Sequence, residues 1–292
     1  MRRWDRWTDT AERFETHRPH LRAVAYRMLG SLSEAEDAVQ EAWLKVSRSD
    51  TDDVQNLGGW LTTVVGRVCL DMLRSRVSRR EEPLGVRLPD PLVSPADGVD
   101  PEHEALLADS VGLALIVVLE TLAPAERLAF VLHDLFAVPF DEIAPVVGRT
   151  PAASRQLASR ARRRVQGAAP APDTDLTRQR EIVDAFLAAA RGGDFEALVA
   201  VLDPDVVVRS DGGVLRPGSV IRGATTVAGR AITFARLAEI AQPAFINGAP
   251  GVVAYAEGQP VSVMAFTIRH DKIVAIDTLN DPERLRRLDL KV

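Results

Sequence analysis

The sequence predicts a multidomain protein in which two all-α domains precede one α+β domain. Apolar side chains recur at helical spacing up to about residue 166, as in amphipathic helices. Proline-rich stretches interrupt the chain twice, and runs rich in valine and isoleucine, typical of strands, gather in the last third. At roughly 100–200 residues per domain, 292 residues fit two or three domains.

The two interruptions set the expected domain boundaries. Residues 82–104 hold five prolines without a helical period, and residues 167–173 form a second, shorter break. We expect an all-α domain at 1–82, a linker at 83–104, a helix-turn-helix domain at 105–167, a short linker at 168–177 and an α+β domain at 178–292.

Composition excludes several classes of protein. No apolar run approaches the ~18 residues that span a bilayer, and no apolar leader follows the N-terminus, so we expect a cytoplasmic protein without a membrane partner. The single cysteine, Cys69, cannot form an internal disulfide or supply a multi-thiolate metal site. Because it lies in an apolar run, we expect a buried, inert thiol, and we expect no cofactor and no metal.

The segment up to residue 81 contains three predicted helices. Apolar positions keep a helical period from Phe14 to Met28, and Gly30 is the predicted stop. Ser33 and Glu36 have the spacing of a capping box that would start the second helix. The third helix is expected to bury Leu61, Val64, Val65, Val68 and Met72.

Charge is distributed unevenly around a net value of −5. Residues 149–164 hold six arginines and no acid, and residues 67–80 hold five arginines against Asp71 alone. Residues 34–53 reverse the balance with seven acids. This pattern suits a protein that meets DNA at two places and another protein elsewhere, whereas solvated basic helix faces are the alternative.

Residues 139–165 have the pattern of a helix-turn-helix. A short helix leads to a turn at Gly148, and Thr150 and Pro151 then occupy the N-cap and first positions of a second helix. Its core-facing positions are expected to be Ala153, Leu157, Ala161 and Val165, and its other face carries Arg155, Gln156, Ser159, Arg162 and Arg163. That face suits a major groove; a basic surface helix in a bundle, or a stand-alone repressor, remains the alternative.

Three segments in this order, 35–44, 60–65 and 141–164, resemble regions 2 and 4 of bacterial sigma factors of the extracytoplasmic-function type. The resemblance implies core RNA polymerase and promoter DNA as partners. It implies that the polymerase is contacted by Asp37, Gln40 and Glu41, the −10 element by Asn56, Trp60, Arg67, Arg74 and Arg76, and the −35 element by Thr150, Arg155, Gln156, Ser159, Arg160 and Arg163.

The last third of the chain differs in kind. An amphipathic helix at 182–190 stops at Gly192, and Asp194 is placed to cap a second, short helix. Strands are predicted at 206–208, 251–256, 261–269 and 272–279, with a tight turn at 270–271. Helices followed by an antiparallel meander suggest an α+β cone around a pocket.

Residues 178–205, 211–213 and 221–224 resemble SnoaL-like domains, which a subgroup of sigma factors carries. Linker and tail signatures of that subgroup occur in altered form at 87–91 and 280–285. The resemblance implies that the domain modulates activity by intramolecular contact, through Leu88, Pro89, Pro91, Asp211, Gly212, Gly213, Asn280, Pro282 and Leu285.

Some SnoaL-like proteins are cyclases or isomerases, so an enzyme must be weighed. Acid–base catalysis would need a carboxylate or histidine held against the substrate. His270 is expected in a solvated turn, Asp211 in a turn and Asp277 on the outer face of its strand. We therefore predict no catalytic residue and no enzyme; the alternative is a small-molecule sensor, or a residual cyclase or isomerase, fused to a DNA-binding module.

Overall fold

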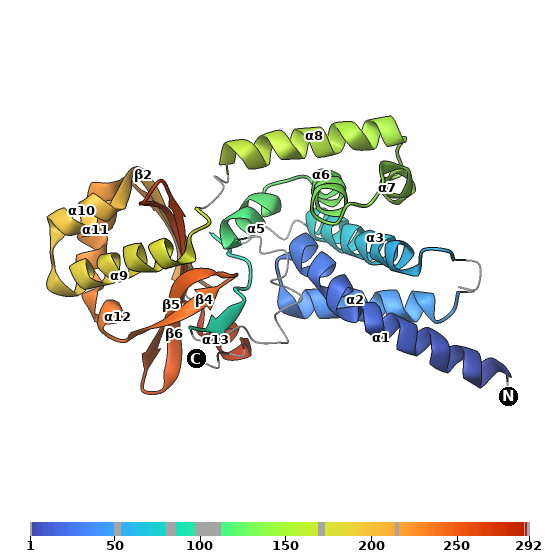
Figure 1. Cartoon of the computed structure of the whole chain (residues 1–292), viewed down its shortest axis with the longest axis horizontal. Helices are drawn as coiled ribbons and strands as arrows, with labels where there is room; N and C mark the ends of the chain where they lie inside the picture. The colour runs from blue at the N-terminus through green and yellow to red at the C-terminus, as the bar shows by residue number, and fades with distance from the viewer. Residues whose placement is uncertain are drawn as a thin grey trace. The chain divides into compact units, whose positions relative to one another are not determined.

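A computed structural model of the chain (Figure 1) describes residues 2–49, 54–79, 86–96, 112–168, 173–213, 216–288 and 290, without the side chains of 2–9, 216 and 217. The chain divides into two compact units. Residues 1–82 and 118–168 form the first, and residues 83–117 and 169–292 form the second. The described part of the first unit is helical and the second combines helices with a sheet, which confirms the predicted fold class.

The first unit begins with α1 (Arg2–Leu29), α2 (Leu32–Val46) and α3 (Leu57–Ser78). α1 ends at the predicted stop, because Gly30 has φ +70° and so adopts the left-handed conformation that glycine tolerates. The predicted capping box of α2 is wrong. The helix already begins at Leu32, and Glu36 pairs with Arg18 of α1 at 2.5 Å instead of reaching back to Ser33.

The apolar stripes of these three helices form one core. Phe14 of α1 packs against Trp43 of α2 with ring centroids 5.1 Å apart, and Val65 and Val68 of α3 are fully buried. Cys69 is buried beside them, as predicted, and burial raises the pKa of its thiol far above the ordinary value. This thiol is therefore protonated and unreactive in the folded protein.

The rest of the first unit comprises α6 (Pro124–Phe130), the π-helical turn η1 (Val131–Leu135), α7 (Phe140–Val147) and α8 (Pro151–Ala168). Its predicted helix-turn-helix is confirmed. Gly148 has φ +67° at the end of α7, and Thr150 Oγ1 accepts a hydrogen bond from the Ala153 N–H at 3.2 Å. α5 (Leu113–Glu120) spans the boundary between the two units.

The buried stripe of α8 differs from the predicted one. Ala161 and Val165 are buried, but Ala153 and Leu157 are only half-buried, and Ser154 and Ala158 occupy the centre of the stripe. A repeat of four residues drifts by about 40° per step around a helix of 3.6 residues per turn. A stripe drawn every four residues therefore rotates out of the core within a few turns.

Arg127 of α6 joins the two helical groups of the first unit. Its guanidinium donates hydrogen bonds to the Met28 carbonyl, at the end of α1, and to the Leu119 carbonyl, at the end of α5, at 2.7 and 2.6 Å. α3 also approaches η1 closely, because a Cβ on Gly66 would lie 3.0 Å from Leu132 Cδ1. The helices of the two predicted all-α domains thus pack into a single unit.

The second unit is built on a twisted sheet of seven strands among the described residues, in the order β1-β4-β5-β6-β7-β2-β3. β2 and β7 are parallel, and every other neighbouring pair is antiparallel. The strands are β1 (Val93–Pro95), β2 (Leu202–Gly212), β3 (Arg216–Arg222), β4 (Ala241–Ile246), β5 (Ala249–Ala256), β6 (Gln259–Arg269) and β7 (Lys272–Leu279). β1 belongs to the predicted linker, so part of that linker is an edge strand.

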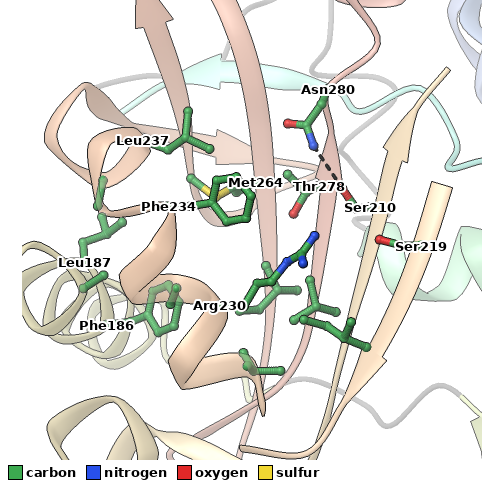
Figure 2. Close-up of a pocket in the computed structure, with 17 residues that line it drawn as sticks. Phe186, Leu187, Ser210, Ser219, Arg230, Phe234, Leu237, Met264, Thr278 and Asn280 are labelled. Carbon is green, nitrogen blue, oxygen red and sulfur yellow. Dashed lines mark hydrogen bonds between the residues drawn. The ribbon is translucent and has the colours of Figure 1, made fainter. Parts of the chain in front are cut away.

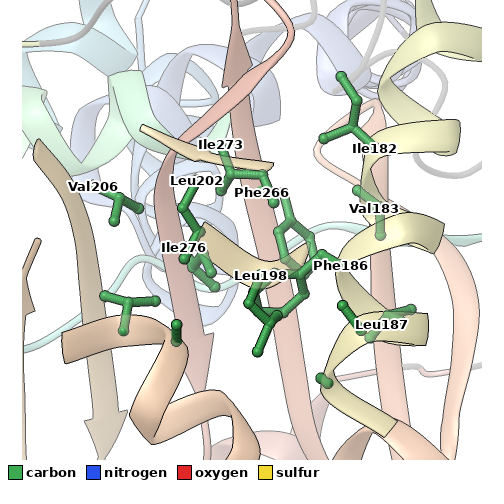
Figure 3. Packing of buried hydrophobic residues seen from close by; sticks show 14 of the residues in the cluster. Ile182, Val183, Phe186, Leu187, Leu198, Leu202, Val206, Phe266, Ile273 and Ile276 are labelled. Carbon is green, nitrogen blue, oxygen red and sulfur yellow. The ribbon is translucent and has the colours of Figure 1, made fainter. Parts of the chain in front are cut away.

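One face of the sheet is covered by helices. Phe186 of α9 (Leu176–Gly192) meets Phe266 of β6 edge-on at 5.6 Å, within an apolar core that also contains Leu198 (Figure 3). The remaining helices of the unit are α10 (Phe195–Val201), α11 (Ala224–Thr233), α12 (Ala235–Glu239) and α13 (Pro282–Arg287). Asp194 caps α10, as predicted, by accepting a hydrogen bond from the Ala197 N–H.

The opposite face of the sheet carries a second apolar core. It receives Val93 and Leu113 from the segment before the domain and Leu285 from α13. Asp277 lies on this face, away from α9, but it is buried rather than solvated, and Arg209 pairs with it at 2.7 Å. Burial raises the pKa of the Asp277 carboxyl, and the Arg209 charge opposes that rise.

Candidate functional sites

The outer face of α2 presents the side chains predicted to meet the polymerase. Asp37, Gln40 and Glu41 are exposed, while Ala38 and Val39 are buried on the other side of the helix. Glu41 is paired within the helix by Lys45 at 2.8 Å, an exposed ion pair that contributes little to stability. The face is therefore polar, acidic at two positions, and open to a partner.

The predicted −10 residues divide between structural and exposed positions. Asn56 caps α3, because its side-chain oxygen accepts a hydrogen bond from the Gly59 N–H at 3.0 Å. Arg67 and Arg74 are exposed along α3. Residues 52 and 53, which precede α3 in the sequence, lie outside the described residues.

Two further members of the −10 set are less available. Trp60 is half-buried in the first turn of α3, and Thr63 donates a hydrogen bond to its carbonyl. Arg76 pairs with Glu34 of α2, so it ties two helices together. In this structure Arg67 and Arg74 are the more accessible cations of the set.

Most of the predicted −35 residues lie on the exposed side of α8. Arg155, Gln156 and Arg163 are exposed, and the Arg155 guanidinium lies 5.6 Å from the centre of the Phe140 ring. Ser159 is half-buried. Thr150 is engaged as the N-cap, so its hydroxyl already serves the helix.

Other arginines of α8 are held by carboxylates of the same unit. Arg160 and Arg164 each reach Glu126 at 3.0 Å, and Arg162 reaches Asp134 at 2.5 Å. Because these contacts anchor the helix, the basic stretch at 149–164 is only partly available to an anion. Sequence reasoning placed Arg160 among the DNA-binding residues without its acidic neighbour.

The segment at 88–90 is held by a cluster of charged and backbone groups that we call the linker clamp: Leu88, Asp90, Asp211 and Arg284. The Arg284 guanidinium contacts Asp90 Oδ1 at 2.5 Å, Asp211 Oδ2 at 2.6 Å and the Leu88 carbonyl at 2.7 Å. Asp211 Oδ2 also accepts a hydrogen bond from the Leu88 N–H at 2.8 Å. One cation thus bridges two carboxylates and the backbone of the linker.

The linker has further anchors in the second unit. The Leu92 N–H donates to Asn247 Oδ1 at 3.1 Å, and the Asn247 N–H donates to the Leu92 carbonyl at 2.8 Å. Pro89 and Pro91 are buried. Gly218 allows the linker to pass, because a Cβ there would clash with the Val86 carbonyl.

The predicted regulatory residues of the domain surround the clamp. Gly213 has φ +69° and faces the Asp281 carboxylate so closely that a Cβ would clash with it, which explains the glycine in this turn. Leu285 is buried, Pro282 occupies the exposed first turn of α13, and Asn280 is half-buried. Gly212 ends β2 beside Asp211.

Sequence reasoning included Asp90 and Arg284 in the signatures at 87–91 and 280–285 without singling them out as contact residues, and it missed Asn247. Asp90 is the single charge among the prolines of 88–91, and Arg284 is the half-buried arginine of a basic tail helix. These signals are compatible with solvated charges, so only the fold reveals their pairing. Asn247 precedes Gly248 in the hairpin turn between β4 and β5. From the sequence alone, such an asparagine is interpreted as a turn residue and not as a contact residue.

A cavity of about 170 Å³ lies between α9, α11 and the sheet (Figure 2). Its walls are mainly apolar, and the single ionisable side chain among them is Arg230. The lining residues are Phe186, Leu187, Ala190, Val208, Ser210, Ser219, Ile221, Val227, Arg230, Ala231, Phe234, Leu237, Ala238, Met264, Ile276, Thr278 and Asn280.

Acid–base groups do not converge on this cavity. His270 lies in the exposed turn between β6 and β7, as predicted, and Asp211 and Asp277 are absent from the lining. Within the described ranges, no group of histidine, cysteine and acidic side chains is placed to hold a metal ion. No described helix is long and apolar enough to cross a membrane.

Comparison with known proteins agrees with these observations. Sigma-70 region 2 matches residues 13–79, and Sigma-70 region 4 matches residues 112–165. The chain is 40% identical over 295 residues to ECF RNA polymerase sigma factor SigJ of Mycobacterium tuberculosis, covering 95% of this chain and 94% of that protein. The crystal structure of SigJ matches 96% of this chain and all of its own, with a TM-score of 0.79 at 37% identity.

Two other proteins are similar over different extents. The probable ECF RNA polymerase sigma factor SigI of Mycobacterium tuberculosis is 36% identical over 275 residues, covering 93% of each chain. An NTF2-like protein from Burkholderia xenovorans matches 39% of this chain and 98% of its own at 23% identity, with a TM-score of 0.30. The chain belongs to the extracytoplasmic-function (ECF) RNA polymerase sigma factors, which are transcription factors rather than enzymes, and it carries a mixed helix-and-sheet domain after its sigma regions.

Proposed function

We propose that the chain, acting in the cytoplasm, docks on core RNA polymerase through the exposed face of α2 and reads promoter DNA through α3 and α8. Asp37, Gln40 and Glu41 meet the polymerase in this proposal. The −10 element is contacted by Asn56, Trp60, Arg67, Arg74 and Arg76, and the −35 element by Thr150, Arg155, Gln156, Ser159, Arg160 and Arg163. One observation carries the docking assignment: three polar side chains are exposed on one face of α2, within region 2.

Charge reversal on α2 tests the docking face. Asp37→Arg with Glu41→Arg should weaken binding to bacterial core polymerase by at least about tenfold, because complementary charge steers and holds such interfaces. Fluorescence anisotropy with labelled full chain measures the affinity. The matched control is Asp184→Arg with Glu196→Arg, two exposed acids of the second unit.

If the α2 double variant bound core polymerase with normal affinity, the proposed docking face would be wrong. A stand-alone repressor, the rival class, predicts something different: tight, specific binding of the full chain to its DNA site without polymerase. Gel-shift titrations with and without core polymerase separate the two classes.

The C-terminal domain, in our proposal, regulates the sigma regions by holding the linker between them. The linker clamp carries this proposal, because Arg284 satisfies Asp90, Asp211 and the Leu88 carbonyl at once. The proposal also includes the predicted regulatory residues around the clamp, which are Leu88, Pro89, Pro91, Gly212, Gly213, Asn280, Pro282 and Leu285. Held linker residues restrict how the two DNA-reading regions can be spaced, and so bias which arrangements are populated.

Removal of the bridging cation tests the clamp. Arg284→Ala leaves Asp90 and Asp211 close together without their shared cation, so the linker should detach and hydrogen exchange at the Leu88 N–H should accelerate. Promoter-dependent transcription in vitro should change by about threefold or more, a coupling of ordinary size. Arg287→Ala, an exposed arginine on the same helix, is the matched control.

Two results would contradict the regulatory role. Unchanged transcription by folded Arg284→Ala protein, with faster exchange at Leu88, would mean that the clamp opens without consequence. Unchanged exchange would mean that Arg284 does not hold the linker.

A small-molecule sensor is the second candidate function, and the cavity beneath α11 favours it. A largely apolar cavity with a few polar groups at one side is the usual form of a ligand site. A residual cyclase or isomerase would need an acid–base pair against the substrate, and the lining supplies Arg230 alone as an ionisable group.

A further inference from the structure

We propose that the cavity of the C-terminal domain binds a small amphipathic carboxylate, whose acid group meets Arg230 and whose apolar body fills the cavity. We further infer that its binding is coupled to the linker clamp through Ser210 and Asn280. The coupling rests on the proposed function of the clamp, whereas the ligand class rests on the cavity itself.

The size and walls of the cavity define the apolar part of the ligand. Apolar side chains from α9, α11 and the sheet supply most of the lining, including Phe186, Val227, Met264 and Ile276. A dry protein cavity of about 150 Å³ accommodates benzene, so about 170 Å³ suits one aromatic ring or a short alkyl chain. A nucleotide or another large polar ligand would not fit these walls.

The charge of the cavity defines the head group. Arg230 is exposed, and no carboxylate among the described residues pairs with it. Its guanidinium lies 5.3 Å from the centre of the Phe234 ring, which is 48% exposed. Figure 2 shows Arg230 reaching from α11 toward the side of the cavity where Ser210, Ser219 and Thr278 lie. An anion at this place would gain a cation and nearby hydroxyl donors, as carboxylate sites in proteins do.

The polar side of the cavity adjoins the linker clamp. Asn280 Nδ2 donates a hydrogen bond to Ser210 Oγ at 3.0 Å, and both side chains line the cavity. The Asn280 N–H donates to the Asp211 carbonyl at 2.7 Å. Successive side chains of a strand point to opposite faces, so Ser210 faces the cavity while Asp211 faces the linker.

The same adjacency recurs at the end of β7. Asp281 follows Asn280 and caps α13 by accepting hydrogen bonds from the Glu283 and Arg284 N–H groups at 2.9 and 3.4 Å. The helix that carries Arg284 therefore starts at Pro282, two residues after Asn280 in the cavity wall. A ligand that orders Ser210 and Asn280 also orders both sides of the clamp, and by linkage the intact clamp favours the ligand.

Calorimetric titration of the full chain tests the ligand class with octanoate and 3-phenylpropanoate as probes, and octan-1-ol and octylamine as uncharged and cationic counterparts. At least one carboxylate should bind with a stoichiometry of one and more tightly than octan-1-ol, and octylamine should not bind. Arg230→Gln should weaken carboxylate binding by about tenfold while leaving octan-1-ol unaffected, because the charged hydrogen bond is lost. Arg236→Gln, an exposed arginine outside the lining, is the matched control.

The coupling has its own measurement. Arg284→Ala should weaken carboxylate binding by about threefold or more, and the carboxylate should slow hydrogen exchange at the Leu88 N–H in the unaltered chain. Absence of saturable binding by both carboxylates, equal binding of octylamine, or equal affinity of Arg230→Gln would overturn the ligand class. Equal affinity of Arg284→Ala and unaltered protein would overturn the coupling.

These outcomes distinguish a failure of the ligand proposal from a failure of the proposed function of the clamp. If Arg284→Ala changes transcription but neither carboxylate binds, the clamp stands and the ligand class is wrong. If a carboxylate binds but Arg284→Ala leaves transcription unchanged, the cavity is a ligand site and the regulatory role of the clamp is wrong.

Discussion

Arg127 illustrates how one buried charge can organise a helical unit. It is 3% exposed, and its two hydrogen bonds end on carbonyls in the last turns of α1 and α5. Helix ends leave such carbonyls without intrahelical partners, and the negative end of the helix dipole favours a cation there. Desolvation lowers the pKa of Arg127 to about 10, so the guanidinium is still charged at neutral pH.

Arg127→Ala should destabilise the first unit by about 3 kcal/mol, because two buried carbonyls lose their charged donor. Tryptophan fluorescence during urea unfolding measures this unit alone, since all four tryptophans precede residue 61. Arg149→Ala, an exposed arginine, should change the free energy of unfolding by less than about 0.5 kcal/mol. A loss below about 1 kcal/mol for Arg127→Ala would show that the two carbonyls find other donors.

At the scale of elements, α8 combines anchored and exposed side chains on one helix, and the exposed ones read DNA in the proposed function. Glu126 and Asp134 hold arginines on the side that faces the unit. Arg155, Gln156 and Arg163 remain exposed on the side available to DNA. Base edges are read by side chains near the start of such a helix, whereas a cation farther along contacts phosphate.

Arg155→Ala and Gln156→Ala should therefore each cost about 1–3 kcal/mol of discrimination at the −35 element. Arg163→Ala should instead weaken binding to all sequences and lower the salt slope by about one unit. Holoenzyme titrations against wild-type and altered −35 elements at several salt concentrations measure both quantities. Equal, sequence-independent losses at all three positions would mean that α8 contacts only phosphate.

The linker shows, at the scale of elements, how a very short strand can be stable. β1 is only three residues long, but it pairs with β4 and brings Val93 into an apolar core. A short strand is stable here because backbone hydrogen bonds and the clamp act on the same segment. An isolated proline-rich segment of this length would leave its N–H groups to water, because it has no second strand with which to pair.

At the scale of the whole molecule, the domain after residue 177 provides the surface on which the linker is held. Without it, Leu88, Leu92, Val93 and Leu113 would lose the groups that bury them. The connection predicted at 168–177 would keep that surface at an effective concentration of order millimolar, so even a weak contact would be maintained. Because the domain is covalently attached, its contact with the rest of the chain does not need a high intrinsic affinity.

Truncation at Asn280, or removal of the whole domain from Thr177, should broaden the range of promoter spacings that the protein accepts. The linker would then be free to adopt other lengths between its helical regions. Transcription in vitro on promoters with spacers lengthened and shortened by two base pairs measures the effect, with circular dichroism as the folding control. An unchanged spacing preference in both truncations would exclude a role of the domain in spacing.

The sequence by itself determined the features that depend on neighbours along the chain. Gly30, Gly148, Thr150 and Asp194 mark helix ends where the structure has them, because capping is a local hydrogen-bonding problem. The exposed acids of α2 and the burial of Cys69 follow from helical periodicity. A resemblance in motif order was enough to identify the family.

Only the tertiary structure decided which charges meet. Arg284 pairs with Asp90 across 194 residues, and the Leu88 N–H donates to Asp211 across 123 residues. Arg127 and Asp277 carry no local sign of burial, yet each is enclosed by segments far away in the sequence. The period of apolar residues predicts which side chains of a helix or strand lie on its buried face. Which distant ions pair depends instead on the order of the strands and on helix packing, because these bring the faces of separate segments together.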